Sequence, residues 1–174
     1  MKFVAYLVLH EIARERTLEQ LVRWGANTVV STFQKFLEHE NELGLCIVDR
    51  LPFAHGHRSL EETFQLGLQM PNNRRRILSR VLLFAETTQR ESFVSSAVDV
   101  ILGSFRYCVN QREATRTTRA MLPPIIEMMW NRREGDTVFV REYGLVFRPM
   151  NVRAPHYRRE YDRLTRHFTE LLEG

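Results

Sequence analysis

The stretch from Glu91 to Asn110 has the clearest pattern of apolar and polar positions in the chain. Five apolar side chains recur in it every three or four residues: Val94, Val98, Ile101, Phe105 and Cys108. This spacing places them on one face of a helix and predicts a core helix. Asp99 lies in its middle. A carboxylate there is costly unless it faces water, is paired or binds a metal, so Asp99 is either a solvated flank residue or a site acid.

Two short apolar runs predict strands, and the first has the composition of a central buried strand. The first covers residues 45–48 and is followed at once by Asp49, and the second covers residues 81–85. In open sheets with helices on both faces, ligands gather beyond the carboxyl ends of parallel strands. Asp49 therefore has a suitable position for a metal or substrate contact. The alternative is a turn residue, because aspartate is also common directly after a strand.

Helical patterns account for most of the remaining chain. Thr17 has the character of an N-cap, and Gly25–Asn27 is a possible break before a second helix over 28–42. Ser59 and Glu62 form a capping box that predicts the start of a further helix. The other predicted elements are a strand or helix over 3–15, helices over 121–130 and 155–172, and a hairpin of 137–141 with 143–148.

The composition is typical of a globular protein with one core. The chain has 174 residues, of which 44% are hydrophobic, so a single domain over 1–174 is expected. No apolar run approaches the roughly 20 residues of a membrane span, and no signal peptide is expected. Cys46 and Cys108 lie within apolar runs without a partner motif, which favours reduced core thiols in a cytoplasmic protein.

Arginine dominates the basic residues. Lysine plus arginine total 25, only Lys2 and Lys35 are lysines, and the net charge is +4. The densest basic cluster consists of Arg74, Arg75, Arg76 and Arg80. Because the arginine fork fits phosphate, this cluster predicts contact with nucleic acid. The alternative is a solvated turn whose arginines pair with some of the 21 acidic residues.

Other motifs contribute little chemistry. His55 and His57 form a His-x-His pair that lacks an evident third metal ligand, so solvated loop histidines are the simpler interpretation. The sequence has no GxGxxG, P-loop, GxSxG or HExxH motif. The sequence therefore gives no support for a dinucleotide-binding protein, a phosphate-loop protein, a serine hydrolase or a zincin.

Three blocks, taken in order, resemble the ribonuclease-H-like bacterial family known as domain-of-unknown-function family 3800. LCIVD at Leu45–Asp49 resembles the family's apolar strand that ends in aspartate. SSAVDVILGSFRYCVN at residues 95–110 resembles its later helix and places Asp99 on that motif's aspartate. GLVFRP at Gly144–Pro149, followed by a final helix with tyrosines, resembles the family's C-terminal end.

The resemblance covers residues 28–172 and leaves 1–27 as an N-terminal helical or mixed segment. It implies an α/β protein with a truncated ribonuclease-H-like layered fold, a few-stranded sheet with flanking helices. It also implies carboxylates around Mg²⁺ or Mn²⁺ that hydrolyse nucleic-acid phosphodiesters, with Asp49 and Asp99 as catalytic metal ligands. The family's first strand, with its Asp-Glu-Ser-Gly signature, has no counterpart here, and Ser96 replaces the usual glutamine. The acidic site is therefore expected to be incomplete.

Two functions lead as hypotheses, ahead of a DNA-binding regulator, for which the sequence has no recognisable helix-turn-helix. The first is a metal-dependent nuclease in which Asp49 and Asp99 hold the metal and the arginines of the 74–76 cluster contact phosphate. The second is a non-catalytic interaction or structural protein. It would associate as a homo-oligomer or with a protein partner through an exposed sheet edge, because missing strands leave such an edge or an apolar surface uncovered. Neither hypothesis includes a membrane.

Overall fold

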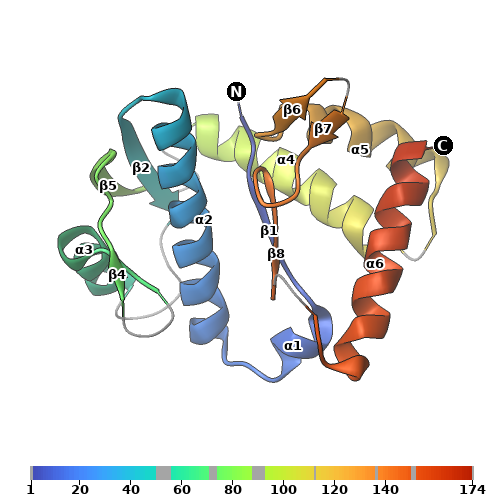
Figure 1. Ribbon diagram of the computed structural model, residues 1–174, viewed down its shortest axis with the longest axis horizontal. Helices are drawn as coiled ribbons and strands as arrows, with labels where there is room; N and C mark the ends of the chain where they lie inside the picture. Colours follow the sequence, from blue (N-terminus) through green and yellow to red (C-terminus); the bar gives the residue numbers. More distant parts are fainter. Residues whose placement is uncertain are drawn as a thin grey trace. The chain divides into compact units, whose positions relative to one another are not determined.

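The computed structural model describes residues 2–49, 56–70, 74–87, 93–111, 113–135, 137–149 and 152–173. Within these ranges the protein is mixed α/β, with helices beside short two-stranded sheets (Figure 1). The chain divides into two compact units. Unit 1 consists of Met1–Arg16 with Ala97–Gly174, and unit 2 is Thr17–Ser96. The expected α/β class and few-stranded sheets are confirmed, whereas the ribonuclease-H-like arrangement stays a prediction.

Unit 2 is built around one long helix and a parallel pair of strands. Its elements are α2 (Leu18–Glu40), β2 (Gly44–Asp49), α3 (Gly56–Leu66), β3 (Leu68–Gln69), β4 (Arg75–Arg76) and β5 (Val81–Thr87). Strand β2 runs parallel to β5, and β3 runs antiparallel to β4. The buried core of this unit consists of Val30, Leu37, Leu68, Leu78 and Val81.

The two predicted strands of this unit are confirmed as β2 and β5. The expectation that residues 45–48 are buried is wrong, because more than half of Leu45 and of Ile47 is exposed. The helix boundaries differ in part. Thr17 caps α2 as expected, through a capping box with Gln20. The helix then continues through Gly25–Asn27, where a break was possible, because a single glycine inside a helix is tolerated. It ends at Glu40, and the C-cap residue Asn41 adopts a left-handed conformation with φ 56°. Helix α3 begins before Ser59, at Gly56.

Unit 1 combines a second parallel pair of strands with several helices. Its elements are β1 (Ala5–Val8), α1 (His10–Arg14), α4 (Phe93–Asn110, from residue 97 onward), α5 (Arg116–Met128), β6 (Arg132–Glu134), β7 (Thr137–Phe139), β8 (Leu145–Arg148) and α6 (Pro155–Glu173). Strand β1 runs parallel to β8, with Ala5 opposite Leu145. The side chains of Phe105, Leu122, Met129, Leu145 and Leu171 lie at the centre of its core.

The predicted hairpin of 137–141 with 143–148 is wrong. Strand β7 pairs with β6 instead, and β8 pairs with β1. The reason is burial: every residue from Leu145 to Phe147 is buried, so β8 belongs in the interior of unit 1. Strands β6 and β7 are exposed throughout and form a surface hairpin.

The two predicted helices near the C-terminus are both present, as α5 and α6. Helix α5 begins at Arg116, before the predicted start at residue 121, because Thr115 and Thr118 form a reciprocal capping box. The final helix, predicted over 155–172, is confirmed as α6. Residues 3–15, predicted as strand or helix, contain both β1 and α1.

Candidate functional site

Asp49 is the last residue of β2, as the sequence indicated. Its Cα lies opposite Thr87, the last residue of β5, so both strands end together. Because the two strands are parallel, the backbone of Asp49 lies at the carboxyl end of the pair, where α/β proteins usually bind ligands. The side chain of Asp49, His55 and the side chain of His57 lie outside the described part of the structure.

Asp99 lies on α4 with an exposed side chain. It belongs to unit 1, whereas Asp49 belongs to unit 2, so neither unit by itself contains both acids. Among the described residues, no group of three histidine, cysteine, aspartate or glutamate side chains is arranged to hold a metal ion. The described side chains alone therefore do not form a site for Mg²⁺ or Mn²⁺. The metal-ligand role of the two acids stays a prediction.

Two arginines of the predicted nucleic-acid cluster, Arg75 and Arg76, form β4 and bind groups inside unit 2. An Nη2 of Arg76 lies 2.8 Å from Oε2 of Glu38. The Nη1 of Arg75 donates to the carbonyl of Gly67 at 3.1 Å, and its Nη2 lies 3.5 Å from Oε1 of Glu62. Gly67 has a φ of +83°, and an added Cβ would clash with the carbonyl of Arg76. These contacts join β4 to α2 and α3.

The other two arginines of the cluster, Arg80 and Arg74, differ in their contacts. Arg80 donates through Nη2 to Oδ1 of Asn41 at 2.8 Å, next to the end of α2. Arg74 is exposed, and its carbonyl accepts a hydrogen bond from the amide of Met70. Three of the four side chains thus have partners within unit 2. Their contact with nucleic acid stays a prediction, and the geometry favours the alternative that this cluster pairs internally.

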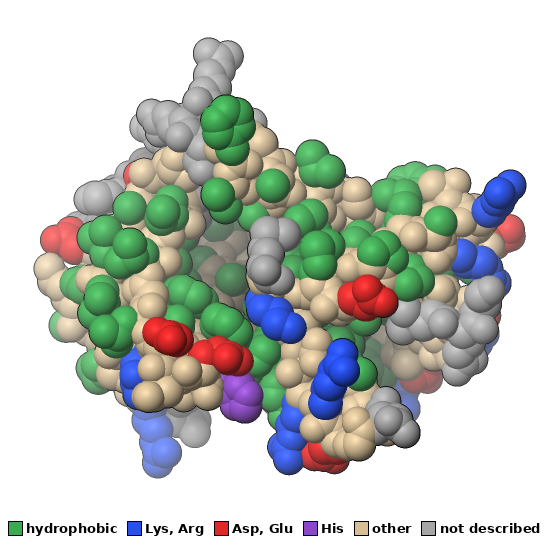
Figure 2. Space-filling view, turned by 90° about the horizontal axis from the view of Figure 1, so that it is seen from above, with side chains coloured by type: hydrophobic (Ala, Val, Ile, Leu, Met, Phe, Trp, Pro, Cys, Tyr) green, Lys and Arg blue, Asp and Glu red, His purple; other side chains and the backbone are tan. Residues whose placement is uncertain are grey.

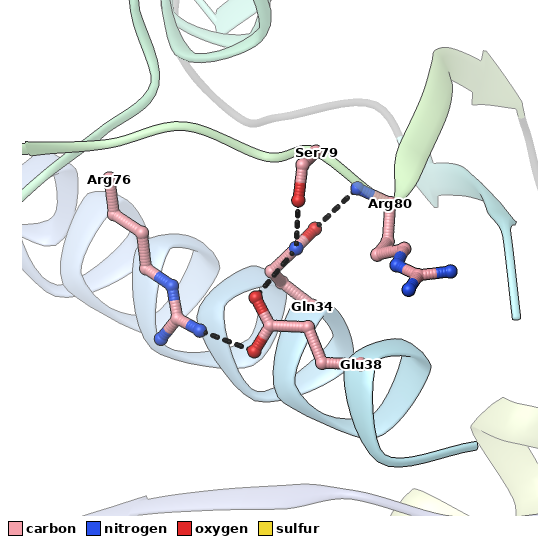
Figure 3. A network of polar contacts seen from close by, with 5 residues as sticks. All are labelled: Gln34, Glu38, Arg76, Ser79 and Arg80. Atoms are coloured by element: carbon pink, nitrogen blue, oxygen red, sulfur yellow. Dashed lines mark hydrogen bonds and ion pairs between the residues drawn. The ribbon is translucent and has the colours of Figure 1, made fainter. Parts of the chain in front are cut away.

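A buried amide, Gln34, organises the polar groups around this cluster (Figure 3). Its Nε2 donates to Oε1 of Glu38 at 2.9 Å and to Oγ of Ser79 at 3.1 Å. Its Oε1 accepts from the backbone N–H of Arg80 at 3.1 Å. The sequence analysis missed Gln34. The available signal was its position on the buried side of α2, four residues after Val30.

The electrostatics of this network keep Glu38 ionised. The hydrogen bond from Gln34, together with the Arg76 guanidinium, holds the pKa of Glu38 below its usual value, although partial burial acts in the opposite direction. Glu38 is therefore a carboxylate at neutral pH, and the guanidinium of Arg76 balances its negative charge. Because the side chains of Arg76 and Glu38 are partly exposed, their ion pair contributes little, about 0–1 kcal/mol. The network joins elements of unit 2.

The two faces of the β2–β5 sheet differ in burial. Side chains alternate along a strand, and Cys46 and Phe84 pack against the core of unit 2. On the opposite side, 56% of Leu45, 63% of Ile47 and 48% of Leu83 are exposed. Leu45 lies opposite Leu83, and Ile47 lies opposite Ala85. We call these four residues the outer face. Apolar side chains reach the molecular surface in several places in Figure 2.

The two cysteines have the character of core residues. Both are free thiols, and Cys108 is fully buried. Burial raises the pKa of Cys46 to about 11 and also raises the pKa of Cys108. Because the thiolate is the nucleophilic form, neither side chain suits nucleophilic catalysis at neutral pH.

The predicted core face of α4 is buried only in part. Phe105 and Cys108 are buried, and Ile101 packs against them. Val94 and Val98, on the same helical face, are exposed, by 68% and 41%. The difference arises because the aromatic rings that cover this face, from Phe3 and Phe168, contact Phe105 in the C-terminal half.

His167 on α6 is a further residue that sequence reasoning missed. It is buried, and its Nε2 lies 2.8 Å from the backbone carbonyl of Cys108. Because a carbonyl only accepts hydrogen bonds, Nε2 is the protonated nitrogen. Its buried Nδ1 has no hydrogen-bond partner among the described residues. The contact fixes α6 against α4, and one ring nitrogen alone does not make a site.

No helix within the described ranges is both long and apolar enough to cross a membrane. Helix α2, for example, spans 23 residues but has charged and polar residues along much of its length. The chain matches none of the protein-family models, curated proteins or solved structures with which it was compared.

Proposed function

We propose that this protein is a non-catalytic interaction protein that associates through the outer face of the β2–β5 sheet. The observation that supports this function is the exposure of Leu45, Ile47 and Leu83 side by side on one sheet. Neighbouring exposed apolar residues commonly mark interaction surfaces. Covering one fully exposed leucine or isoleucine is worth about 1.5–3 kcal/mol, so covering this face would supply a substantial driving force.

The edges of the same sheet also favour association. Among the described residues, β2 and β5 pair only with each other. Each strand therefore has one edge that no other described strand covers, and such edges attract further strands. The outer face and these edges lie on the same two strands.

A second copy of this chain is the partner that fits the outer face best. The face consists of Leu45, Ile47, Leu83 and Ala85, and none of these carries charge. A partner surface has to be apolar as well, and another copy presents such a surface without charge repulsion. A two-fold symmetric contact places the same patch of both copies together, and two sheets pack face to face about 10 Å apart. The proposed assembly is therefore a homodimer.

Replacing Leu45 with glutamate tests this function. We expect the wild-type protein to have about twice the 20.6 kDa mass of the chain in light scattering. The Leu45→Glu variant is expected to be a monomer. Symmetry buries the new carboxylate twice, so the dimer dissociation constant should rise about 100-fold or more, equivalent to roughly 3 kcal/mol.

Leu18→Glu is the matched control. Leu18 is also an exposed leucine of unit 2, but it lies at the start of α2 and away from the outer face. This variant should remain a dimer. A wild-type monomer at about 100 μM, far above a micromolar dissociation constant, would contradict the proposal. Equal dimerisation of the Leu45→Glu variant would contradict it too.

A second candidate function is metal-dependent hydrolysis of nucleic-acid phosphodiesters. It is favoured by one observation, the position of Asp49 at the carboxyl end of a parallel strand pair. The second acid of this hypothesis, Asp99, is exposed on α4. This function ranks below association because the position of Asp49 is the one structural observation that supports it.

Cleavage assays with Mg²⁺ or Mn²⁺ and labelled DNA or RNA test this candidate. If it holds, Asp49→Asn and Asp99→Asn should each lower the cleavage rate by about 100-fold or more, since even outer-shell changes cost 10–100-fold. The control is Asp162→Asn, which changes an exposed aspartate that pairs with Arg158 on α6. Absence of cleavage, or equal rates in all three variants, would remove the nuclease function.

A further inference from the structure

Helix α6 presents a stripe of three arginines to solvent. Arg159, Arg163 and Arg166 recur at positions i, i+4 and i+7, so they share one face of the helix. All three side chains are exposed. Within the described ranges, none of them has a hydrogen-bond or ion-pair partner. We call these three residues the α6 stripe.

Other basic residues close to the stripe are already engaged. Arg158 pairs with Asp162 on the same helix, with Nε 2.9 Å from Oδ1. Arg119 of α5 donates to the carbonyl of Glu170 at 2.8 Å. The side chain of Glu170, one turn beyond Arg166, makes no ion pair with it among the described contacts. The stripe therefore retains three guanidinium groups that are free to bind an external anion.

The helix that carries the stripe is fixed to unit 1 along its other side. Phe168 and Leu171 lie in the core, and His167 contacts the carbonyl of Cys108. Near the start of the helix, the carboxylate of Glu160 accepts the backbone N–H groups of residues 10 and 11 at 2.8 and 3.1 Å. The carboxylate of Glu160 thus points toward α1 and binds the backbone N–H groups at the start of that helix. The α6 stripe is consequently a preorganised row of positive charge.

We propose that the α6 stripe contacts the phosphate backbone of double-stranded nucleic acid. Arginine presents a planar fork of donors that matches phosphate oxygens. With a rise of 1.5 Å per residue, the three side chains span about 10 Å along the helix axis. A duplex carries one phosphate charge per roughly 1.7 Å of its axis, so phosphates are available along the whole stripe.

The surroundings of the stripe favour a duplex over a membrane or a single strand. Binding to a membrane surface requires the apolar side of an amphipathic helix, and that side of α6 is buried in unit 1. Single strands are usually held by exposed aromatic rings that stack on bases. Tyr157 and Tyr161, the tyrosines of α6, are partly buried and lie away from the stripe, where they contact Glu15 and Phe147.

Removing the stripe tests the inference. The variant with R159Q, R163Q and R166Q together should bind a duplex DNA or duplex RNA at least about tenfold more weakly at low salt than the wild type. The slope of log affinity against log salt concentration should fall by about 3, since each phosphate contact contributes roughly 0.9. Glutamine is a good helix former, so α6 should be retained, which far-UV circular dichroism checks.

The matched control removes three arginines that pair with acids elsewhere, as R14Q, R23Q and R132Q. These side chains lie 3.7, 2.9 and 2.8 Å from glutamate oxygens. The control lowers the net charge equally and should largely retain duplex affinity. Equal losses in both triple variants, or no loss in the stripe variant, would overturn the inference. So would tighter binding to single strands or to anionic phospholipid vesicles than to duplexes. None of these outcomes depends on dimerisation.

Discussion

Phe105→Ala is expected to lower the free energy of unfolding by about 3–5 kcal/mol, the usual cost of removing a buried aromatic ring. Only 2% of Phe105 is exposed, and its ring lies 6.0 Å from that of Phe3 and 6.1 Å from that of Phe168. These rings come from both ends of the chain, so Phe105 joins the N-terminal segment and α6 to α4. Removal of its ring leaves a cavity at the centre of unit 1. Urea denaturation followed by circular dichroism measures the loss.

Phe93→Ala provides the control on the same helix. Phe93 is 97% exposed, at the first turn of α4. Its replacement should change the free energy of unfolding by no more than about 0.5 kcal/mol, as for most surface changes. If both variants lose similar stability, the C-terminal half of α4 is not the part of the helix that holds the core.

The elements that the sequence located correctly are those defined by near neighbours. Residues 45–48 and 81–85 form strands because each run is short and apolar between polar flanks. The final helix follows from one apolar side that repeats at helical spacing, and Thr17 caps α2 through a residue only three positions away. Such signals lie within a few residues of each other and need no knowledge of the rest of the chain.

The errors arise where distant segments decide the structure. The hairpin of 137–141 with 143–148 was predicted from adjacency, yet Leu145 pairs with Ala5 from the other end of the sequence. Likewise, apolar periodicity placed Val94 and Val98 in a core, although the covering rings reach only the later half of α4. Periodicity shows which side of an element is apolar, but it does not show whether another element covers that side.

The candidate site shows the same difference between local signals and long-range contacts. Asp49 was placed correctly at a strand end from local pattern alone. Its pairing with Asp99 depends on residues far apart in the sequence and stays a prediction. The arginine cluster suggested a nucleic-acid surface, but the acceptors of Arg75 and Arg76 come from other segments. A charge run in the sequence does not reveal which charges are neutralised by folding.

Gln34→Glu is expected to destabilise unit 2 by about 3 kcal/mol or more at pH 8, comparable to leaving a buried charge without compensation. The change replaces the amide donor of Gln34 by a carboxylate next to Oε1 of Glu38, now 2.9 Å from Nε2. The new carboxylate is then buried beside the partly exposed charge of Glu38, and Ser79 loses its present donor. Gln65→Glu is the control. The amide of Gln65 donates to Glu61 on exposed α3, so its change should cost only a few tenths of a kcal/mol.

The pH dependence separates the variant from the wild type. In the wild type the pKa of Glu38 is lowered, so its stabilising effect is present above the unfolded pKa and is lost as the pH falls through the folded pKa. In the Gln34→Glu variant, the two carboxyls share a proton, which raises the folded pKa of the pair above its unfolded value of about 4.3. The stability of the protonated pair is then fully present below the unfolded pKa and is lost as the pH rises through the raised folded pKa. Unfolding curves of the two proteins should therefore approach each other on acidification, whereas a difference that is independent of pH would show that repulsion at Glu38 is not the cause.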